Sequence, residues 1–293
     1  MPEHDTTVLR LLRRWFPGSF ATSAYAVAER ACHLDGERGD RLFARACGRF
    51  RNLHQANPRY IPALKLWGAA LERRAPRLRS PEAERTRAEA EEMLSLALEL
   101  NPNDPDTLAA LASVLERRAW LKPPEVAGPL LARARHLAGK GLSLRPHHSH
   151  LLNVSAFVLY GQAHALPEED LDRRLAEALD IFKSEYRTTP TASILTGWGT
   201  VLFAQADRTS GTDAERLLRE AKGKYEAVLA RDPTSSTYNL ACVCARLGEF
   251  DECRRWLERS GEPGRLATRE EVAADPELSA VRDCAWFRLL LAE

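Results

Sequence analysis

The chain has 293 residues, of which 44% are hydrophobic and 28% are charged, and this balance excludes an intrinsically disordered protein. Its 42 basic and 41 acidic residues leave a net charge of +1, whereas proteins that bind nucleic acids need a basic excess to displace counterions. No run of eighteen apolar residues is present, and residues 1–20 lack the apolar segment of a secretory signal. We therefore expect a cytoplasmic protein with no membrane span and no nucleic-acid partner. Arginine supplies 36 of the basic residues, which indicates a GC-rich, bacterial genome.

The first predicted element is a short amphipathic helix within residues 1–19. Its apolar residues recur at helical intervals of three and four, at Val8, Leu11, Leu12, Trp15 and Phe16. We interpret this helix as an N-terminal cap on the structure that follows it. The alternative interpretation is a basic amphipathic helix that lies on a membrane surface.

A proline recurs at nearly constant intervals through the middle of the chain. The first three intervals are 44 residues long and the fourth is 43, and they separate Pro58, Pro102, Pro146, Pro190 and Pro233. A fixed period of this length is typical of a repeat array, in which each unit buries its apolar face against its neighbours.

Each repeat holds two helix patterns that end at the proline. The first pattern has apolar residues three and four apart, most clearly in Leu64-x2-Trp67-Gly68-x2-Leu71 and Leu195-x2-Trp198-Gly199-x2-Leu202. The second pattern has the form Ala90-x3-Leu94-x2-Ala97-x4-Pro102. We predict that the small residue after each tryptophan lets the partner helix approach closely.

These patterns resemble the tetratricopeptide repeat (TPR), whose signature is W-x2-L-G-x2-Y, then A-x3-F, then P. The resemblance covers roughly residues 20–262. It implies an all-α, right-handed α-solenoid of about six helical hairpins, with capping helices at both ends. A HEAT-type array also fits the period, but the Trp-Gly pairs favour the TPR pattern.

The repeats here are longer than the usual 34 residues of a TPR. About ten extra residues lie between the two helices of each central repeat, as the constant spacing from first to second pattern shows. Turn-forming residues locate the inserted turns, at Ser80-Pro81, Pro123-Pro124, Pro167 and Thr209-Ser210-Gly211.

The last repeat, residues 238–257, looks like the closing repeat of many bacterial TPR proteins. The segment Asp275-Pro276-Glu277-Leu278 and the helix pattern after it look like their usual ending, and we interpret this part as a C-terminal cap. The predicted organisation is therefore a capping helix at 1–19, a repeat array at 20–262 and a capping helix at 263–293.

In TPR arrays the first helix of each repeat lines a concave groove, so the resemblance implies a binding site. The positions that it places in the groove are Lys65, Glu72, Arg73, Glu116, Arg117, Asn153, Phe157, Tyr160, Thr196, Phe203, Asn239 and Arg246. The first five are charged, whereas the later ones offer aromatic rings and side-chain amides. Amides can hold a peptide backbone and aromatic rings anchor interfaces, so this end suits a peptide or helix. Packing between helices is the alternative role for these aromatic and amide residues.

The sequence predicts neither a metal nor another cofactor. None of the six cysteines forms a CxxC pair, and the histidines of His147-His148-Ser149-His150 cannot all face one ion on a helix. A phosphate loop, a nucleophile elbow and an HExxH motif are all missing from the sequence, so we expect no enzyme.

These observations predict a non-enzymatic scaffold or adaptor that binds a peptide or helical segment of a partner protein in the groove. The alternative is a regulatory or sensor subunit of a neighbouring enzyme, such as a protease or a signalling ATPase. An RNA-binding helical repeat, a clamp for a C-terminal carboxylate and an enzyme with an unrecognised site are further alternatives. The oligomeric state and the identity of the partner stay open.

Overall fold

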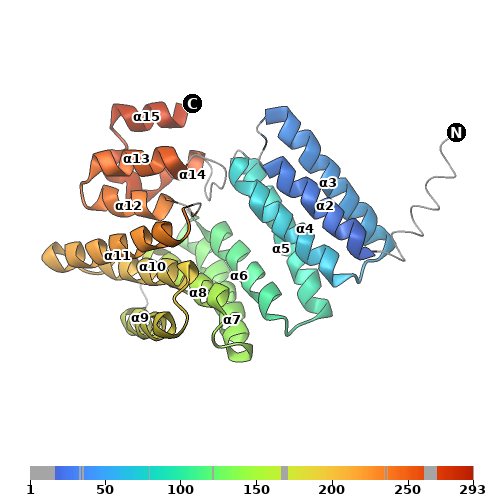
Figure 1. The fold of residues 1–293 in the computed structure, drawn as a ribbon, viewed down its shortest axis with the longest axis horizontal. Coiled ribbons are helices and arrows are strands. Elements are labelled where there is room, and N and C mark those ends of the chain that lie inside the picture. Colours follow the sequence, from blue (N-terminus) through green and yellow to red (C-terminus); the bar gives the residue numbers. More distant parts are fainter. Residues whose placement is uncertain are drawn as a thin grey trace. The chain divides into compact units, whose positions relative to one another are not determined.

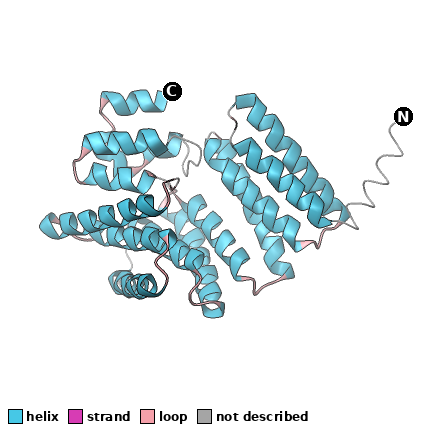
Figure 2. Cartoon of the chain, in the orientation of Figure 1, coloured by secondary structure: helices cyan, strands magenta, loops and turns pink. Residues whose placement is uncertain are grey.

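The structure is a computed structural model, and its described residues form helices joined by turns and loops, with no strand (Figures 1 and 2). It describes residues 17–32, 34, 36–78, 80–120, 122–165, 171–233, 235, 237–260 and 269–292. The all-α class predicted from the sequence is confirmed for these residues. The predicted N-terminal helix, with Val8 to Phe16, lies outside them. No described helix combines the length and apolar character that crossing a bilayer requires.

The chain forms two compact units, residues 1–114 and 115–293. The described part of the first unit holds four helices and most of a fifth, namely α2 (Pro17–Cys32), α3 (Gly36–Ala56), α4 (Ile61–Arg74), α5 (Ser80–Leu100) and α6 (Pro105–Ala119). A short 3-10 turn, η1 (Ala75–Arg77), joins α4 to α5. Helices α2 to α5 lie side by side (Figure 1), with α2 packed on α3 and α4, and α4 packed on α5.

The second unit contains the remaining described helices. They are α7 (Pro124–Leu144), α8 (Ser149–Ala165), α9 (Leu171–Thr188), α10 (Ala192–Asp207), α11 (Gly211–Arg231), α12 (Tyr238–Arg246), α13 (Phe250–Ser260), α14 (Arg269–Ala274), η2 (Pro276–Val281) and α15 (Ala285–Ala292). Here α8 packs on α9 and α10, α10 on α11, and α12 on α13 and η2. Helices α2 to α13 thus occupy the positions predicted for six helix pairs, while the solenoid arrangement stays a prediction.

The inserted turns fall where the sequence predicts them. Helix α5 begins at Ser80, α7 begins at Pro124, and α11 begins at Gly211. The extra residues lengthen the second helix of each pair, so α5, α7 and α11 each have 21 residues. Pro167 lies outside the described residues.

Close packing explains the small residue that follows each tryptophan. A Cβ atom on Gly68 would lie 2.7 Å from Cγ of Leu94, and one on Gly199 would lie 2.8 Å from Cε1 of Tyr225. Real Cβ atoms do not approach other atoms so closely, so a larger residue would push α4 from α5 and α10 from α11. The predicted close approach of paired helices is confirmed at both positions.

Apolar side chains from paired helices build the core of each unit. In the first unit the rings of Phe50 and Trp67 stack with centroids 6.0 Å apart, and both are buried. In the second unit the C-terminal segment adds Leu278, Val281 and Phe287, which are fully buried. The C-terminal segment is therefore part of the core of the second unit.

Candidate functional site

The predicted groove residues of the first unit, Lys65, Glu72 and Arg73, lie on α4, and Lys65 and Arg73 form ion pairs within that unit. Lys65 Nζ lies 2.6 Å from Oδ2 of Asp104, and Arg73 Nε lies 2.9 Å from Oε1 of Glu29. Glu72 is half-buried. Burial alone would raise the pKa of Asp104, but hydrogen bonds from Lys65 and Thr107 outweigh it and lower this pKa. These charges stabilise the unit, whether or not they also meet a partner.

The remaining predicted residues belong to the second unit. Glu116 and Arg117 are half-buried at the end of α6. The others lie on α8, α10 and α12, and we call them the first-helix row: Asn153, Phe157, Tyr160, Thr196, Phe203, Asn239 and Arg246.

The structure joins three members of the row into a continuous stack. The ring centroids of Tyr160 and Phe203 lie 5.7 Å apart with the rings nearly parallel, and Trp120 also stacks on Tyr160 with centroids 5.7 Å apart. The guanidinium of Arg246 lies 5.7 Å from the centroid of Phe203. Side chains from α8, α10 and α12, far apart in the sequence, thus form one surface across successive first helices.

The C-terminal segment covers this end of the row. Glu277 of η2 accepts hydrogen bonds from Tyr160 Oη at 3.1 Å and from Arg246 Nη1 at 2.7 Å, and Arg246 also pairs with Asp207. Tyr160 and Phe203 are each only 4% exposed. In this conformation the two rings stabilise the fold and offer almost no contact area to a partner.

Two buried carboxylates hold η2 in place. Asp275 caps η2 by accepting a hydrogen bond from the backbone N–H of Glu277 at 2.9 Å, and it pairs with the hydroxyl of Tyr238. Asp275 is 0% exposed and Glu277 is 2% exposed. Buried carboxylates are stable only when they are hydrogen-bonded or paired, so each contact of this network contributes to the position of η2.

The network also shifts the ionisation of its members. Burial, followed by the charges of Glu277 and Asp275, raises the pKa of Tyr160 well above 10.0. Burial would lower the pKa of Arg246, but its hydrogen bonds to Glu277 and Asp207 raise it. Tyr160 is therefore a fixed hydrogen-bond donor and Arg246 a fixed cation over the whole physiological range of pH.

The other end of the row is open. Asn153, Thr196 and Asn239 are half-buried near the beginning of α8, α10 and α12, and Phe157 is half-buried at the middle of α8. The Oδ1 atom of Asn153 is buried without a hydrogen-bond partner. It lies 3.2 Å from the point where a Cβ atom on Gly197 would lie, so the missing side chain of Gly197 leaves room for this amide.

The two other polar residues at the open end are already engaged. The side chain of Thr196 donates a hydrogen bond to the backbone of Ala192 at 3.0 Å. Asn239 forms a side-chain hydrogen bond with Tyr225. Asn153 and Phe157 are therefore the members of the row that could meet a partner without losing an existing polar contact.

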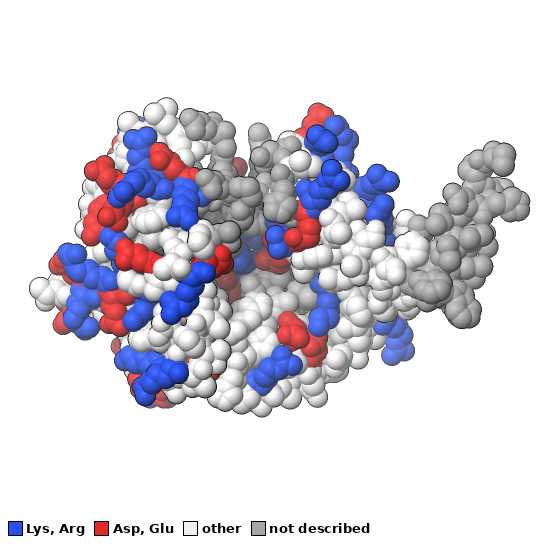
Figure 3. Space-filling model, viewed as in Figure 1, with Lys and Arg blue, Asp and Glu red and all other residues white. Residues whose placement is uncertain are grey.

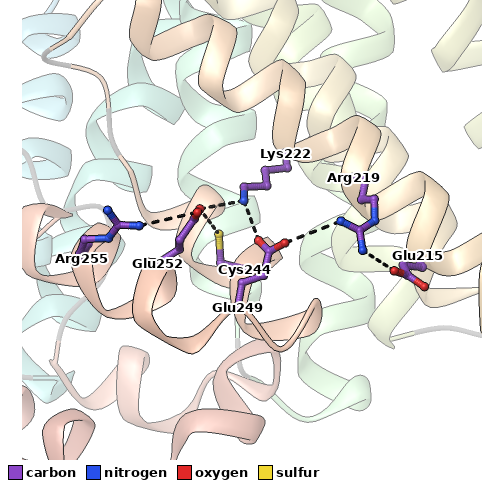
Figure 4. Close-up of polar contacts among 7 residues, drawn as sticks. All are labelled: Glu215, Arg219, Lys222, Cys244, Glu249, Glu252 and Arg255. Carbon is purple, nitrogen blue, oxygen red and sulfur yellow. Dashed lines mark hydrogen bonds and ion pairs between the residues drawn. The ribbon is translucent and has the colours of Figure 1, made fainter.

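A separate polar cluster lies among α11, α12 and α13 (Figure 4). Lys222 Nζ is 2.6 Å from Oε2 of Glu249 and 2.7 Å from Oε2 of Glu252, and the thiol of Cys244 lies 3.9 Å from Glu252. The sulfur and one oxygen of each carboxylate lie within 4.8 Å of one another, a spacing suited to a metal ion. However, the Lys222 ammonium binds both carboxylates, and burial raises the pKa of Cys244 to about 12. Because the thiol is neutral and both carboxylates are already paired with Lys222, we interpret this cluster as a structural ion network and not as a metal site.

Sequence reasoning did not identify Asp207, Asp275 and Glu277 as partners of the groove residues. The Asp-Pro-Glu sequence signals a capped turn, but its contact with Tyr160 spans 117 positions in the chain and follows from tertiary packing alone. The histidines at residues 147–150 surround the beginning of α8, where His147 pairs with Glu185 at 2.6 Å.

Neither the known family models nor the curated proteins give a match to this sequence.

Proposed function

We propose that the protein is a non-enzymatic scaffold or adaptor that binds an extended or helical segment of a partner protein along the open end of the first-helix row. In this proposal the helix pairs form a TPR-like, right-handed solenoid, and the protein acts in a bacterial cytoplasm. The proposal rests on the side chains that α8, α10 and α12 bring to one surface.

The observation that carries the proposal is the unpaired amide oxygen of Asn153. A buried acceptor without a partner costs about 1–3 kcal/mol, and a backbone N–H of a bound segment would recover this energy after a small rotation of the amide. The half-exposed ring of Phe157, one helical turn away on α8, adds apolar contact area.

The contacts at the covered end of the row are a second argument for a polypeptide ligand. Tyr160 and Arg246 already bind the carboxylate of Glu277 within a short, capped segment of the same chain. Side chains of the row can therefore bind a polypeptide segment, as they do with this one. This contact also limits the uncovered part of the row to Asn153, Phe157, Thr196 and Asn239.

Affinity purification from the native organism tests the proposal. The bait proteins are the wild type, an Asn153→Ala/Phe157→Glu variant and a control, Ile181→Glu, which changes a 47% exposed apolar residue on α9 of the same unit. We expect a stoichiometric partner with the wild type and the control, and its loss with the double variant. Equal recovery of the same partners with all three folded proteins would contradict the proposal.

A further inference from the structure

Helix α3 of the first unit carries a row of arginines that the first-helix row does not use. Arg38, Arg41, Arg45 and Arg49 follow one another at intervals of three and four residues. At 3.6 residues per turn these four side chains lie within about 80° of the helix circumference, and at 1.5 Å per residue they extend over about 16 Å. We call them the α3 arginine stripe.

Among the described residues, acidic side chains neutralise only Arg41 of the stripe. Glu37 pairs with Arg41 at 2.7 Å, with both side chains exposed, and the other acid of α3, Asp40, pairs with Arg74. Arg49 donates a hydrogen bond to the hydroxyl of Ser23 at 3.2 Å, which fixes its position without neutralising it. Among the described residues no carboxylate forms an ion pair with Arg45 or Arg49. The distal half of the stripe therefore presents uncompensated positive charge.

The surface beside the stripe is small and uncharged. Ala44 and Gly48 lie next to Arg41 and Arg45 on the helix surface; Ala44 is exposed and Gly48 half-buried. A Cβ atom on Gly48 would have no neighbour within 4 Å, so the space above it is open. A second backbone can thus approach α3 closely, alongside the arginines.

We infer that the α3 arginine stripe binds an acidic α-helix of a partner protein. A helix with Glu or Asp at every third or fourth residue repeats the spacing of the stripe, so its carboxylates meet successive guanidinium groups in charge-assisted pairs. The small residues beside the stripe provide the close approach that two packed helices need.

Two other anionic partners fit the surface less well. The large hydrophobic side chains that are exposed among the described residues lie at or beyond Val126, so the described part of the first unit, from Pro17 onward, presents none to insert into a membrane. Nucleic acid needs a broad basic surface, whereas the stripe is narrow and the chain has a net charge of only +1. On the face drawn in Figure 3, acidic and basic side chains are interspersed.

Binding of a synthetic peptide to the full-length chain tests this inference. The probe is a fluorescent alanine-rich peptide of about 20 residues, long enough to form a helix, with four glutamates aligned at intervals of three and four. A second peptide has the same composition with the glutamates spread around the helix. Fluorescence anisotropy at low salt measures both affinities for the wild type, for Arg45→Glu/Arg49→Glu and for a control, Arg216→Glu/Arg254→Glu.

We expect the wild type to bind the aligned peptide more tightly than the scattered one. The α3 variant should lose at least tenfold in affinity, equivalent to about 1.4 kcal/mol, because two attractions become repulsions. The control variant reverses two exposed arginines of the second unit and has the same net charge, so its affinity should stay within about twofold of the wild type.

Several results would overturn the inference. Equal binding of the two peptides, or equal losses in both variants, would show that net charge and not the stripe governs binding. Tighter binding of duplex DNA or of phosphatidylserine vesicles than of the aligned peptide, at the same salt, would assign the stripe to another class of partner. Circular dichroism verifies the fold, and Arg45→Gln/Arg49→Gln replaces the α3 variant if the charge reversal unfolds it.

Discussion

Removal of the Glu277 carboxylate is the sharpest test of how the C-terminal segment is held. In the Glu277→Ala variant, Tyr160 loses the acceptor of its hydroxyl group, and Arg246 loses one of its two carboxylate partners. Because Tyr160 is only 4% exposed, water cannot replace the lost acceptor without opening the core.

The expected loss of stability follows from these contacts. Breaking a fully buried ion pair costs about 3–5 kcal/mol. Arg246 keeps Asp207 and its side chain is 30% exposed, which reduces the cost. We therefore expect Glu277→Ala to lower the free energy of unfolding by about 2–4 kcal/mol. Glu277→Gln keeps an acceptor for Tyr160 and should cost about half as much.

Urea unfolding followed by circular dichroism measures these differences. The matched control is Glu258→Ala, which removes an exposed carboxylate paired with Arg254 at 2.8 Å on α13. Exposed pairs of this kind contribute about 0.5 kcal/mol or less. A loss below about 1 kcal/mol for Glu277→Ala, or one equal to that of the control, would refute the role assigned to the buried network.

Three further predictions concern packing and pH. Trp67→Ala should lower the free energy of unfolding by about 3–5 kcal/mol, because the ring is 5% exposed and stacks on Phe50. Urea unfolding measures this loss, and a value below about 1 kcal/mol would contradict the packing. Gly197→Ala should cost about 1–3 kcal/mol, since the new Cβ would lie 2.4 Å from the ring of Phe182, whereas Gly223→Ala meets no atom within 4 Å and should stabilise α11 by about 0.5–1 kcal/mol. Thermal melting compares the two, and the same sign for both would contradict the prediction. The pKa of Asp104 is lower in the folded chain than its usual 3.8, so the stability from its pair with Lys65 is present above about pH 4 and is lost as the pH falls through the folded pKa. The stability difference between wild type and Asp104→Asn should therefore shrink between pH 6 and pH 3, and a difference independent of pH would exclude this ion pair as its source.

The periodicity of the sequence was enough to predict the helices. Apolar residues three and four apart define one face of a helix, and proline and glycine define its ends, so α5, α7 and α11 begin at the predicted residues. The Trp-Gly pairs also predicted close packing of each first helix on its partner. These signals are local, because each depends on residues within one helix pair.

Tertiary structure alone decided how the predicted groove residues are used. The sequence predicted Tyr160, Phe203 and Arg246 as groove positions of successive repeats, but it did not show that Glu277 binds Tyr160 and Arg246. Contacts between residues that are distant in the chain leave no periodic pattern in the sequence. Whether a side chain is buried depends on which other segment packs against it in the folded chain. The same reason explains Asn153: its residue type indicated a polar contact, and only packing against Gly197 determined that its oxygen lacks one.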